Sequence, residues 1–315
     1  MSTSPVRDDD GVALVDAAVA GLNEIILGKE AQIRLCLACL LARGHLLIED
    51  IPGVGKTTLA HALARTLGLS YQRIQFTSDL LPADIIGVSV FEAETSQFRF
   101  HRGPVFAQLV LADEVNRATP KAQSALLEAM EEHQVTADGQ TYPLTEPFFV
   151  IATQNPVYQV GTFPLPESQL DRFLMRIQIG YPAESLERQL LLGSDRRDLL
   201  AALAPALKPQ QLLRLQGAVP RVHASEALLD YVQAIARYTR QAAEFEAGLS
   251  PRAVIALLRA AQAWAMMHAH SGVLPEDVQA VLSAVVGHRL APREESRFRD
   301  AGQVGEFVLN AVPVP

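Results

Sequence analysis

The stretch HLLIEDIPGVGKTTLAHALARTLG, residues 45–68, decides the fold of this chain. It opens with an apolar run, Leu46 to Ile48, that does not alternate with polar residues, as expected of a strand buried on both faces of a parallel sheet. It ends with leucines at every fourth position and then Gly68, which is the pattern of a helix and its C-terminal cap. The glycine-rich turn Gly53–Thr57 therefore lies between a buried strand and a helix.

A turn in that place can bind phosphate, because its backbone amides and the positive end of the helix point at the same spot. We expect Lys56 to reach the β- and γ-phosphates of ATP and Thr57 to place its hydroxyl on Mg²⁺. Asp50 stands where such loops have their first glycine, and Asp tolerates the left-handed backbone that glycine supplies there. On this segment alone, a plain turn with a surface lysine stays open. The expected nucleotide-binding residues are Asp50, Pro52, Gly53, Val54, Gly55, Lys56, Thr57, Thr58 and Gly28.

A second apolar strand, in the segment FAQLVLADEVNRA, ends in two acids. The strand is expected from Leu109 to Ala112, and Asp113 and Glu114 follow it. A nucleotide hydrolase needs a carboxylate for its metal and a group that activates water. We expect Asp113 to hold Mg²⁺ and Glu114 to orient and deprotonate the attacking water. After a phosphate-binding loop, the pair indicates a Walker B motif.

Two further strands complete the pattern of the first domain. The strand PFFVIAT runs into Asn155, which can bond the γ-phosphate or the attacking water; alternatively, it begins a turn before Pro156. The strand in LMRIQIGYP follows a short helical segment, ESQLDRF, that contains Arg172. Strands that alternate with helices and carry ligand groups at their carboxyl ends predict a doubly wound α/β domain.

These segments together resemble one protein family. The runs LADEVNRA, SALLEAMEEHQVTADGQTYPL, FFVIATQNP and GTFPLPESQLDRFL are similar to those of the MoxR family of AAA+ ATPases, and the likeness extends from about residue 26 to residue 287. The resemblance implies an AAA+ P-loop NTPase domain with two hairpin inserts, followed by a small all-α lid domain. It also implies a Mg-dependent ATPase that forms a homo-oligomer, expected as a hexameric ring, and remodels or assembles partner protein complexes.

The family pattern also assigns roles to single residues. By the resemblance, Asn155 is sensor 1, Arg172 is the arginine finger that reaches a neighbour's ATP, and Arg252 is sensor 2. Arg252 lies in the first turn of a helix that begins at Ser250 and Pro251, where an arginine opposes the helix dipole. A simple surface arginine is the alternative, and whether Arg252 acts on its own subunit or on a neighbour stays open. Family members often work with a von Willebrand factor A-domain partner, some in metal-cofactor insertion.

Two hairpins can be read from the residues themselves. In HQVTADGQTYPL, the pair Asp138-Gly139 between alternating flanks is a strong two-residue turn signal. In VSVFEAETSQFRFHRG, residues 91 and 93 are expected to face residues 98 and 100. The resemblance makes these the pre-sensor-1 hairpin and the helix-2 insert. Either could contact a protein client or be a plain connection.

The chain becomes helical and rich in alanine and leucine after Pro182. We therefore expect three parts: a flexible tail over residues 1–10, the AAA+ α/β domain over 11–183 and the helical lid over 184–315. Cys36 and Cys39 form a lone pair in an apolar helix, where buried inert thiols are a better interpretation than a redox or metal site. The polar start, and the lack of an apolar run near the roughly 18 residues of a membrane span, predict a cytoplasmic protein without stable membrane insertion.

The net charge of the chain and the presence of Glu114 bear on which other functions are open. A magnesium-chelatase-like motor subunit stays open as a variant of the remodelling ATPase. A nucleic-acid helicase is disfavoured, because the net charge is −8 and residues 122–171 contain no lysine or arginine to meet phosphates. A non-hydrolysing switch is disfavoured because Glu114 is present. The expected ligands are thus ATP, Mg²⁺ and a protein client, with no nucleic acid.

Overall fold

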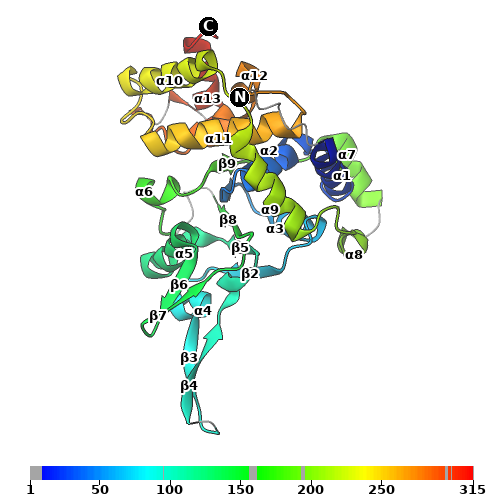
Figure 1. The fold of residues 1–315 in the computed structure, drawn as a ribbon, viewed down its shortest axis with the longest axis vertical. Helices are drawn as coiled ribbons and strands as arrows, with labels where there is room; N and C mark the ends of the chain where they lie inside the picture. The colour runs from blue at the N-terminus through cyan, green and yellow to red at the C-terminus, as the bar shows by residue number, and fades with distance from the viewer. Residues whose placement is uncertain are drawn as a thin grey trace, which may run out of the picture.

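The computed structural model describes residues 9–94, 96–155, 162–192, 196–294, 297–298 and 300–314. Its centre is a sheet of five parallel strands in the order β2–β5–β8–β1–β9 (Figure 1). The strands are β1 (Leu46–Glu49), β2 (Tyr71–Gln75), β5 (Leu109–Asp113), β8 (Phe149–Gln154) and β9 (Met175–Ile177). The predicted α/β domain is confirmed.

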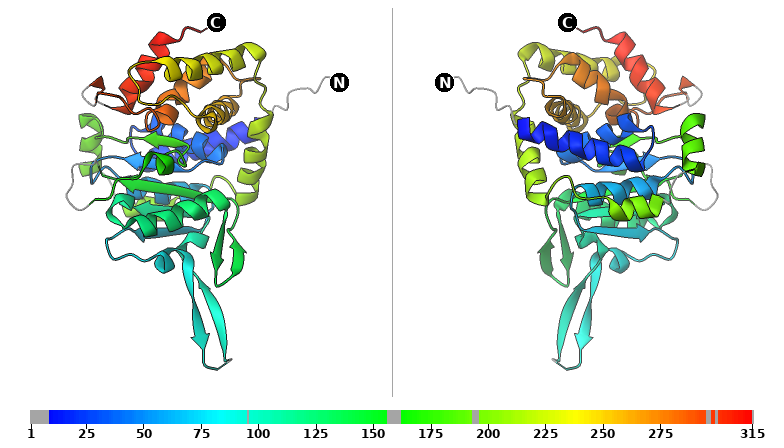
Figure 2. Two further views of the ribbon diagram at one scale, coloured as in Figure 1. Left: turned by 90° about the vertical axis from the view of Figure 1, so that its left-hand side faces the viewer. Right: turned by 90° about the vertical axis from the view of Figure 1, so that its right-hand side faces the viewer.

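Successive side chains of a strand point to opposite sides, so an apolar strand has two apolar faces to bury. Helices cover both faces of this sheet. On one face Leu46 and Ile48 pack with α1 (Asp9–Ile25), α2 (Glu30–Leu41) and α3 (Lys56–Thr66). On the other face Leu47 packs with α4 (Pro82–Ile86) and α5 (Pro120–Glu132). The helices on the two sides of the sheet can be followed in Figure 2. The apolar run from Leu46 to Ile48 is continuous because the strand is buried on both of its faces.

Two antiparallel hairpins project from the α/β domain, away from the helical end of the molecule (Figure 1). The longer joins β3 (Gly87–Glu92) to β4 (Gln97–Arg102), and the shorter joins β6 (Gln134–Ala137) to β7 (Gln140–Pro143). Asp138 and Gly139 both have positive φ, 51° and 77°, so the predicted two-residue turn is confirmed.

The expected pairing in the longer hairpin is half right. Phe91 lies opposite Phe98, and their rings meet edge to face at 5.3 Å. Phe100, however, lies opposite Ser89, and Ala93 falls in the turn between the strands. The error is one of register, because the loop is longer than the alternation alone indicated.

In the described part of the chain after residue 183, the named elements are all helices, joined by loops. Its helices are α7 (Glu184–Leu192), α8 (Arg196–Ala202), α9 (Pro209–Ala218), α10 (Glu226–Gln241), α11 (Pro251–Met267), α12 (Pro275–Val286) and α13 (Ala301–Ala311). The remaining short elements are α6 (Glu167–Leu170), η1 (Pro104–Phe106), η2 (Val115–Arg117) and η3 (Val219–Arg221). The Ser250 hydroxyl caps α11 by accepting a bond from the Ala253 amide at 3.1 Å.

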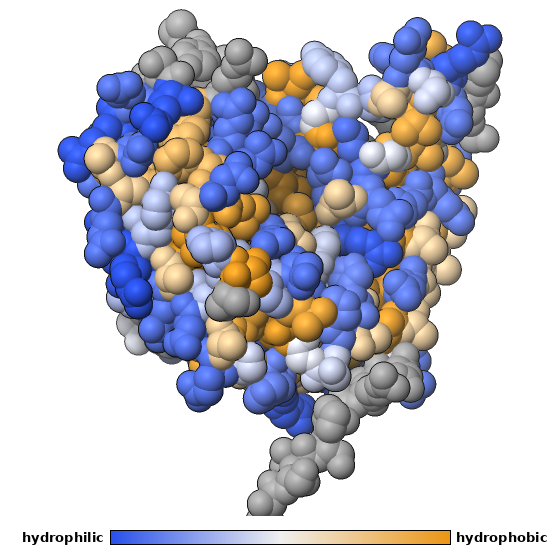
Figure 3. Space-filling view, turned by 90° about the horizontal axis from the view of Figure 1, so that it is seen from above, coloured by the Kyte–Doolittle hydropathy of each residue, from blue (hydrophilic) through white to orange (hydrophobic). Residues whose placement is uncertain are grey.

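The surface and the cysteines agree with a globular protein. Seen from the helical end, hydrophilic and hydrophobic residues are intermingled over the face (Figure 3). Within the described residues, none of the helices has the length and hydropathy to cross a membrane. Cys36 and Cys39 are free and buried, and burial raises the pKa of Cys36 to about 12. The predicted burial of both thiols is confirmed, and their inertness stays a prediction.

Candidate functional site

The glycine-rich turn joins β1 to α3, as predicted. Gly53 and Gly55 have φ of 87° and 92°, and Gly55 is the N-cap of α3. A side chain at either glycine would meet no neighbour within 4 Å, so these positions need glycine for the left-handed backbone rather than for space. The turn therefore presents its amides at the start of α3, where an anion is favoured.

Lys56 is held in this turn by three acceptors. Its ammonium donates to the carbonyls of Asp50 and Ile51 and, at 3.0 Å, to Oδ1 of Asn155. The side chain is buried, and burial lowers the pKa of Lys56, while the charges of nearby Asp50, Asp113 and Glu114 oppose that shift. The lysine thus points to the carboxylates of the second motif.

One threonine fixes both acids of that motif. The Thr153 hydroxyl, on neighbouring β8, donates to Asp113 Oδ1 at 2.5 Å and accepts from the Glu114 amide at 2.9 Å. Arg73 on β2 donates to the other oxygen of Asp113 at 2.7 Å. Glu114 has φ of 58°, a strained conformation for a non-glycine residue of the kind that clusters at active sites.

Asn155 links the lysine to the acid. Its Oδ1 accepts from Lys56, and its Nδ2 donates to Glu114 Oε1 at 3.3 Å. Its own carbonyl accepts from Asn116 at 3.2 Å, and the side chain is buried. The structure therefore brings Lys56, Glu114 and Asn155 into one hydrogen-bonded group at the carboxyl ends of β1, β5 and β8. We call this side of the sheet the carboxyl edge.

The oxygen donors expected for a metal also belong to the carboxyl edge. Thr57 is the second residue of α3, beside Lys56, and Asp113 ends β5. Asp113 Oδ1 accepts one bond, from Thr153, and keeps lone-pair capacity for a second, whereas Oδ2 accepts two bonds from Arg73. A hydroxyl and a carboxylate fit the preference of Mg²⁺ for a few protein oxygens together with phosphates and water.

Asp50 has a different role from the one expected. It is absent from the described residues with positive φ, so it does not replace glycine by adopting a left-handed backbone. Its carboxylate instead accepts bonds from three amides: Ile51 at 2.8 Å, and Ile179 and Gly180 at 2.6 Å each. Asp50 thus ties the turn to the segment that follows β9, a role that local backbone rules could not reveal.

Gly28 lies in the turn between α1 and α2 with φ of 67°. A side chain there would clash with Leu186 of α7, at 2.2 Å. The next residue, Lys29, donates to the carbonyl of Tyr181 at 2.8 Å, beside the amides that Asp50 binds. Gly28 therefore lies near the segment anchored by Asp50, and a direct role in nucleotide binding stays a prediction.

Arg172 and Arg252 lie at the opposite side of the sheet, which we call the amino edge. Arg172 follows α6 rather than lying on it, and precedes β9. Arg172 Nη2 lies 2.8 Å from one oxygen of Glu131, and Arg252 Nη1 lies 3.3 Å from the other. Glu131 is near the end of α5, which runs back from the carboxyl edge. One acid therefore holds both arginines.

A cavity of about 270 Å³ surrounds this pair and is rich in arginine. Its walls include residues 44 and 45, just before β1, and Leu174, just before β9, which places it at the amino edge. Its charged lining residues are Arg43, Arg172, Arg252, Arg259, Arg289, Glu131 and Asp171. Sequence reasoning missed Glu131, Arg289, Thr153 and Arg73, although Glu131 and Thr153 stood in segments that had drawn attention.

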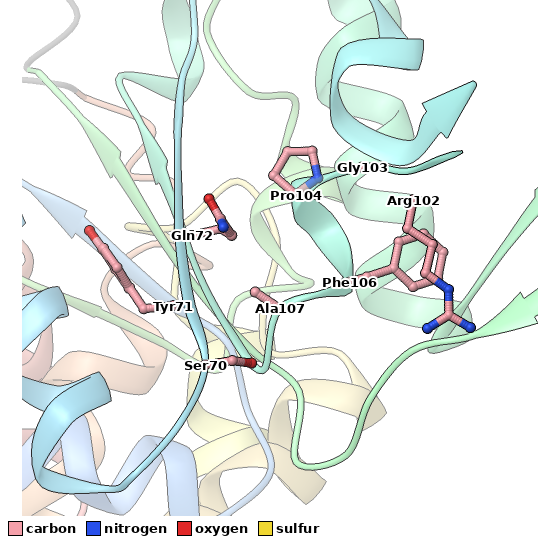
Figure 4. A pocket seen from close by; sticks show the side chains of 8 residues that line it. All are labelled: Ser70, Tyr71, Gln72, Arg102, Gly103, Pro104, Phe106 and Ala107. Atoms are coloured by element: carbon pink, nitrogen blue, oxygen red, sulfur yellow. The ribbon is translucent and has the colours of Figure 1, made fainter. Parts of the chain in front are cut away.

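A second cavity lies outside both sites (Figure 4). It measures about 460 Å³ and lies between the start of β2 and the segment that follows β4. Tyr71 and Phe106 are among its walls, and none of the predicted nucleotide-binding residues lines it. Its larger volume therefore does not make it the nucleotide site.

Comparison with known proteins follows the same division of the chain. Residues 45–175 match the ATPase family associated with various cellular activities (AAA), and residues 237–306 match the AAA lid domain. The uncharacterized protein YeaC of Bacillus subtilis is 44% identical, covering 96% of this chain and 95% of that protein. The chaperone MoxR1 of Mycobacterium tuberculosis is 39% identical, covering 96% of this chain and 81% of that protein.

Two more similarities cover nearly the whole chain. The protein MoxR of Paracoccus denitrificans is 36% identical, with 95% of each protein covered. A crystal structure of a protein assigned as an ATPase in Cytophaga hutchinsonii superposes with a TM-score of 0.88 at 35% identity. That alignment covers 98% of this chain and 97% of the solved one.

Proposed function

Because this chain belongs to the MoxR family of AAA+ ATPases and is an ATP hydrolase with a chaperone-like role, we propose that it works as a homo-oligomeric ring, expected to be a hexamer. Each subunit binds ATP and Mg²⁺ at its carboxyl edge, and the amino edge of a neighbour completes that site. Hydrolysis drives the remodelling or assembly of a partner protein complex, with a von Willebrand factor A-domain protein as partner and metal-cofactor insertion among its tasks.

The observation that carries this proposal is the position of two arginines. Arg172 and Arg252 share Glu131 at the amino edge, whereas Lys56, Asp113 and Glu114 are at the carboxyl edge of the same sheet. Both arginines are partly exposed. Because these arginines lie at the side of the sheet opposite to their own phosphate-binding turn, we infer that they bind the ATP of an adjacent subunit. For the same reason we assign Arg252, like Arg172, to the neighbour's ATP.

The carboxyl edge supplies the other groups that hydrolysis needs. Lys56 leaves its carbonyl acceptors for the β- and γ-phosphates, and the amides of the turn bind the same groups. Thr57 and Asp113 hold Mg²⁺, which neutralises phosphate charge when bound. Glu114 takes the proton of the attacking water, and Asn155, already bonded to Glu114, orients that water or the γ-phosphate.

A protein client suits the hairpins better than DNA does. Phe98 is 74% exposed and stands against Phe91 near the tip of the longer hairpin, while Phe100 stacks on Tyr142 of the shorter one at 4.4 Å. These rings offer apolar contact to a polypeptide. The shorter hairpin has no lysine or arginine. On the longer one Arg99 is paired with Glu92, and Arg102 lies over the ring of Phe106 at 5.1 Å. Duplex phosphates would find few partners there.

The dependence of ATPase activity on assembly tests the proposal. The rate per subunit is measured over a range of protein concentrations, and sedimentation velocity at each concentration gives the assembly state. We expect the rate per subunit to rise as the oligomer forms. A constant rate while the sedimentation coefficient changes from monomer to oligomer would contradict a site shared between subunits.

A further inference from the structure

The lid is hydrogen-bonded to the segment that carries Arg172. Arg289, three residues beyond α12, donates through Nε to Asp171 Oδ1 at 2.6 Å. Its two terminal nitrogens donate to the carbonyls of Phe173 at 2.7 Å and Leu174 at 3.0 Å, and more weakly to that of Asp171 at 3.3 Å. A single lid side chain therefore bonds the residues on both sides of Arg172.

The burial of Arg289 makes this contact a fixed one. Its side chain is only 5% exposed, and a guanidinium in that environment needs its donors satisfied and its charge paired. Asp171 supplies the charge and the carbonyls supply the acceptors. The planar fork of arginine can meet these acceptors together, whereas the ammonium of lysine cannot. His288, the preceding residue, adds a fifth bond to this segment, at 2.9 Å from the Phe173 carbonyl.

The same part of the lid is connected to the carboxyl edge. Arg176, in β9, donates to the Gly287 carbonyl at 2.7 Å and pairs with Glu49 at 3.3 Å. Glu49 ends β1 and directly precedes Asp50, whose carboxylate holds the segment after β9. A continuous set of bonds thus joins the phosphate-binding turn, strand β9 and the end of α12.

We propose that Arg289 is a positioning residue: the lid of each subunit, through Arg289, holds that subunit's own Arg172 in place for the ATP of its neighbour. This inference rests on the proposed function. Arg172 has its flanking residues fixed by Arg289 while its own side chain is directed to Glu131. A lid that shifts with the nucleotide of its own subunit would move the finger offered to the next one.

The direct test begins with Arg289→Gln in the full chain. A misplacement of the finger by about 1 Å is expected to lower kcat by about 10²-fold. The affinity for ATP should stay close to that of the wild type, because the bonds of Arg289 go to residues 171–174 and to α12 and none goes to the phosphate-binding turn. Arg293→Gln is the matched control: Arg293 also bonds a carbonyl, that of Phe245 at 3.0 Å, but does so within the lid, and its loss should leave kcat nearly unchanged.

Mixed oligomers then locate the defect. Arg289→Gln subunits keep a good phosphate site and Lys56→Ala subunits keep a good finger, so their mixture should regain activity. A mixture of Arg289→Gln with Arg172→Ala, both deficient in the finger, should not. The mixture of Arg172→Ala with Lys56→Ala is the reference for a shared site, and sedimentation confirms that each pair assembles together.

The outcomes separate the two claims. Recovery in the reference, with none for Arg289→Gln plus Lys56→Ala, would overturn the positioning role alone, since the defect would then lie in the subunit's own site or fold. No recovery in the reference would overturn the shared site and this inference with it. Arg289→Lys guards against misfolding, because it keeps the charge and most of the side chain. It should show the same mixing pattern with a smaller loss of kcat, and a different pattern would count against the proposal.

Discussion

The two edges of one sheet differ in what they contain. The carboxyl edge has Lys56, Asn155 and Glu114 in one hydrogen-bonded group, with Asp113 joined to it through Thr153. Its remaining need is a nucleotide with its metal. The amino edge has arginines whose partners are acids of the same chain, Glu131 and Asp171. The first edge can be understood within one subunit. The second acquires a catalytic meaning only when a neighbour brings a phosphate to it.

Replacing Arg172 tests this contrast with the largest expected effect. Arg172→Ala should lower kcat by roughly 10³- to 10⁵-fold, or about 4 to 7 kcal/mol, if it is an arginine finger. Binding of ATP, measured by calorimetry, should change little because the carboxyl edge is intact. Arg34→Ala is the control, since Arg34 is likewise paired with acids of the same chain, Glu30 and Asp16. A surface pair is typically worth less than about 1 kcal/mol, and an equally small effect at Arg172 would end the distinction between the edges.

Glu114→Gln probes the carboxyl edge by itself. Loss of a general base is expected to lower the hydrolysis rate by about 10²- to 10⁴-fold. The amide is close in shape to the carboxylate and Asp113 is untouched, so Mg²⁺-dependent binding of ATP should persist. Hydrolysis is followed by phosphate release and binding by a fluorescent ATP analogue. Turnover at the wild-type rate would assign water activation to another group.

A smaller effect, on stability rather than turnover, is expected at the amino edge in acid. His45 is fully enclosed there, accepting from the Val150 amide at 3.0 Å, and burial lowers its pKa from 6.5 to about 4, with Arg252 and His133 adding to the shift. Between these values the unfolded chain binds more protons, so stability should fall as the pH falls. The loss between about pH 7 and about pH 4 is about 3 kcal/mol for this one group.

Urea unfolding of the wild type and His45→Gln at both pH values isolates this contribution. His288 is also buried with a pKa well below its usual value, but it is common to both proteins and cancels in the difference. We expect the wild type to lose more stability on acidification than the variant does. Equal losses would mean that His45 does not titrate as its burial requires.

The carboxyl edge was readable from the sequence because its residues follow strands in chain order. Asp113, Glu114 and Asn155 each stand where an apolar run ends, and Lys56 follows the turn after such a run. Parallel strands bring these positions together. The amino edge was not readable in this way. Glu131 and Arg252 are 121 residues apart, and Arg289 is 118 residues from Asp171, so no local pattern connects these charged pairs.

Asp50 shows the limit of local rules in a different way. Backbone propensity suggested that it stands in for a glycine, but its carboxylate bonds amides 129 and 130 residues away. Asp50 fits in place of the first glycine because of these tertiary hydrogen bonds, and not because of its backbone conformation. The register of the longer hairpin was missed because alternation gives the faces of a strand but does not give the length of a loop.

The measurement that tests the central claim most directly is a structure of the assembled Glu114→Gln protein with Mg²⁺ and ATP. We predict that Arg172 leaves Glu131 and that its guanidinium lies at hydrogen-bond distance, about 3 Å, from the γ-phosphate bound by the neighbouring subunit. An Arg172 that still pairs with Glu131 in that state, or that contacts the nucleotide of its own subunit, would contradict the account.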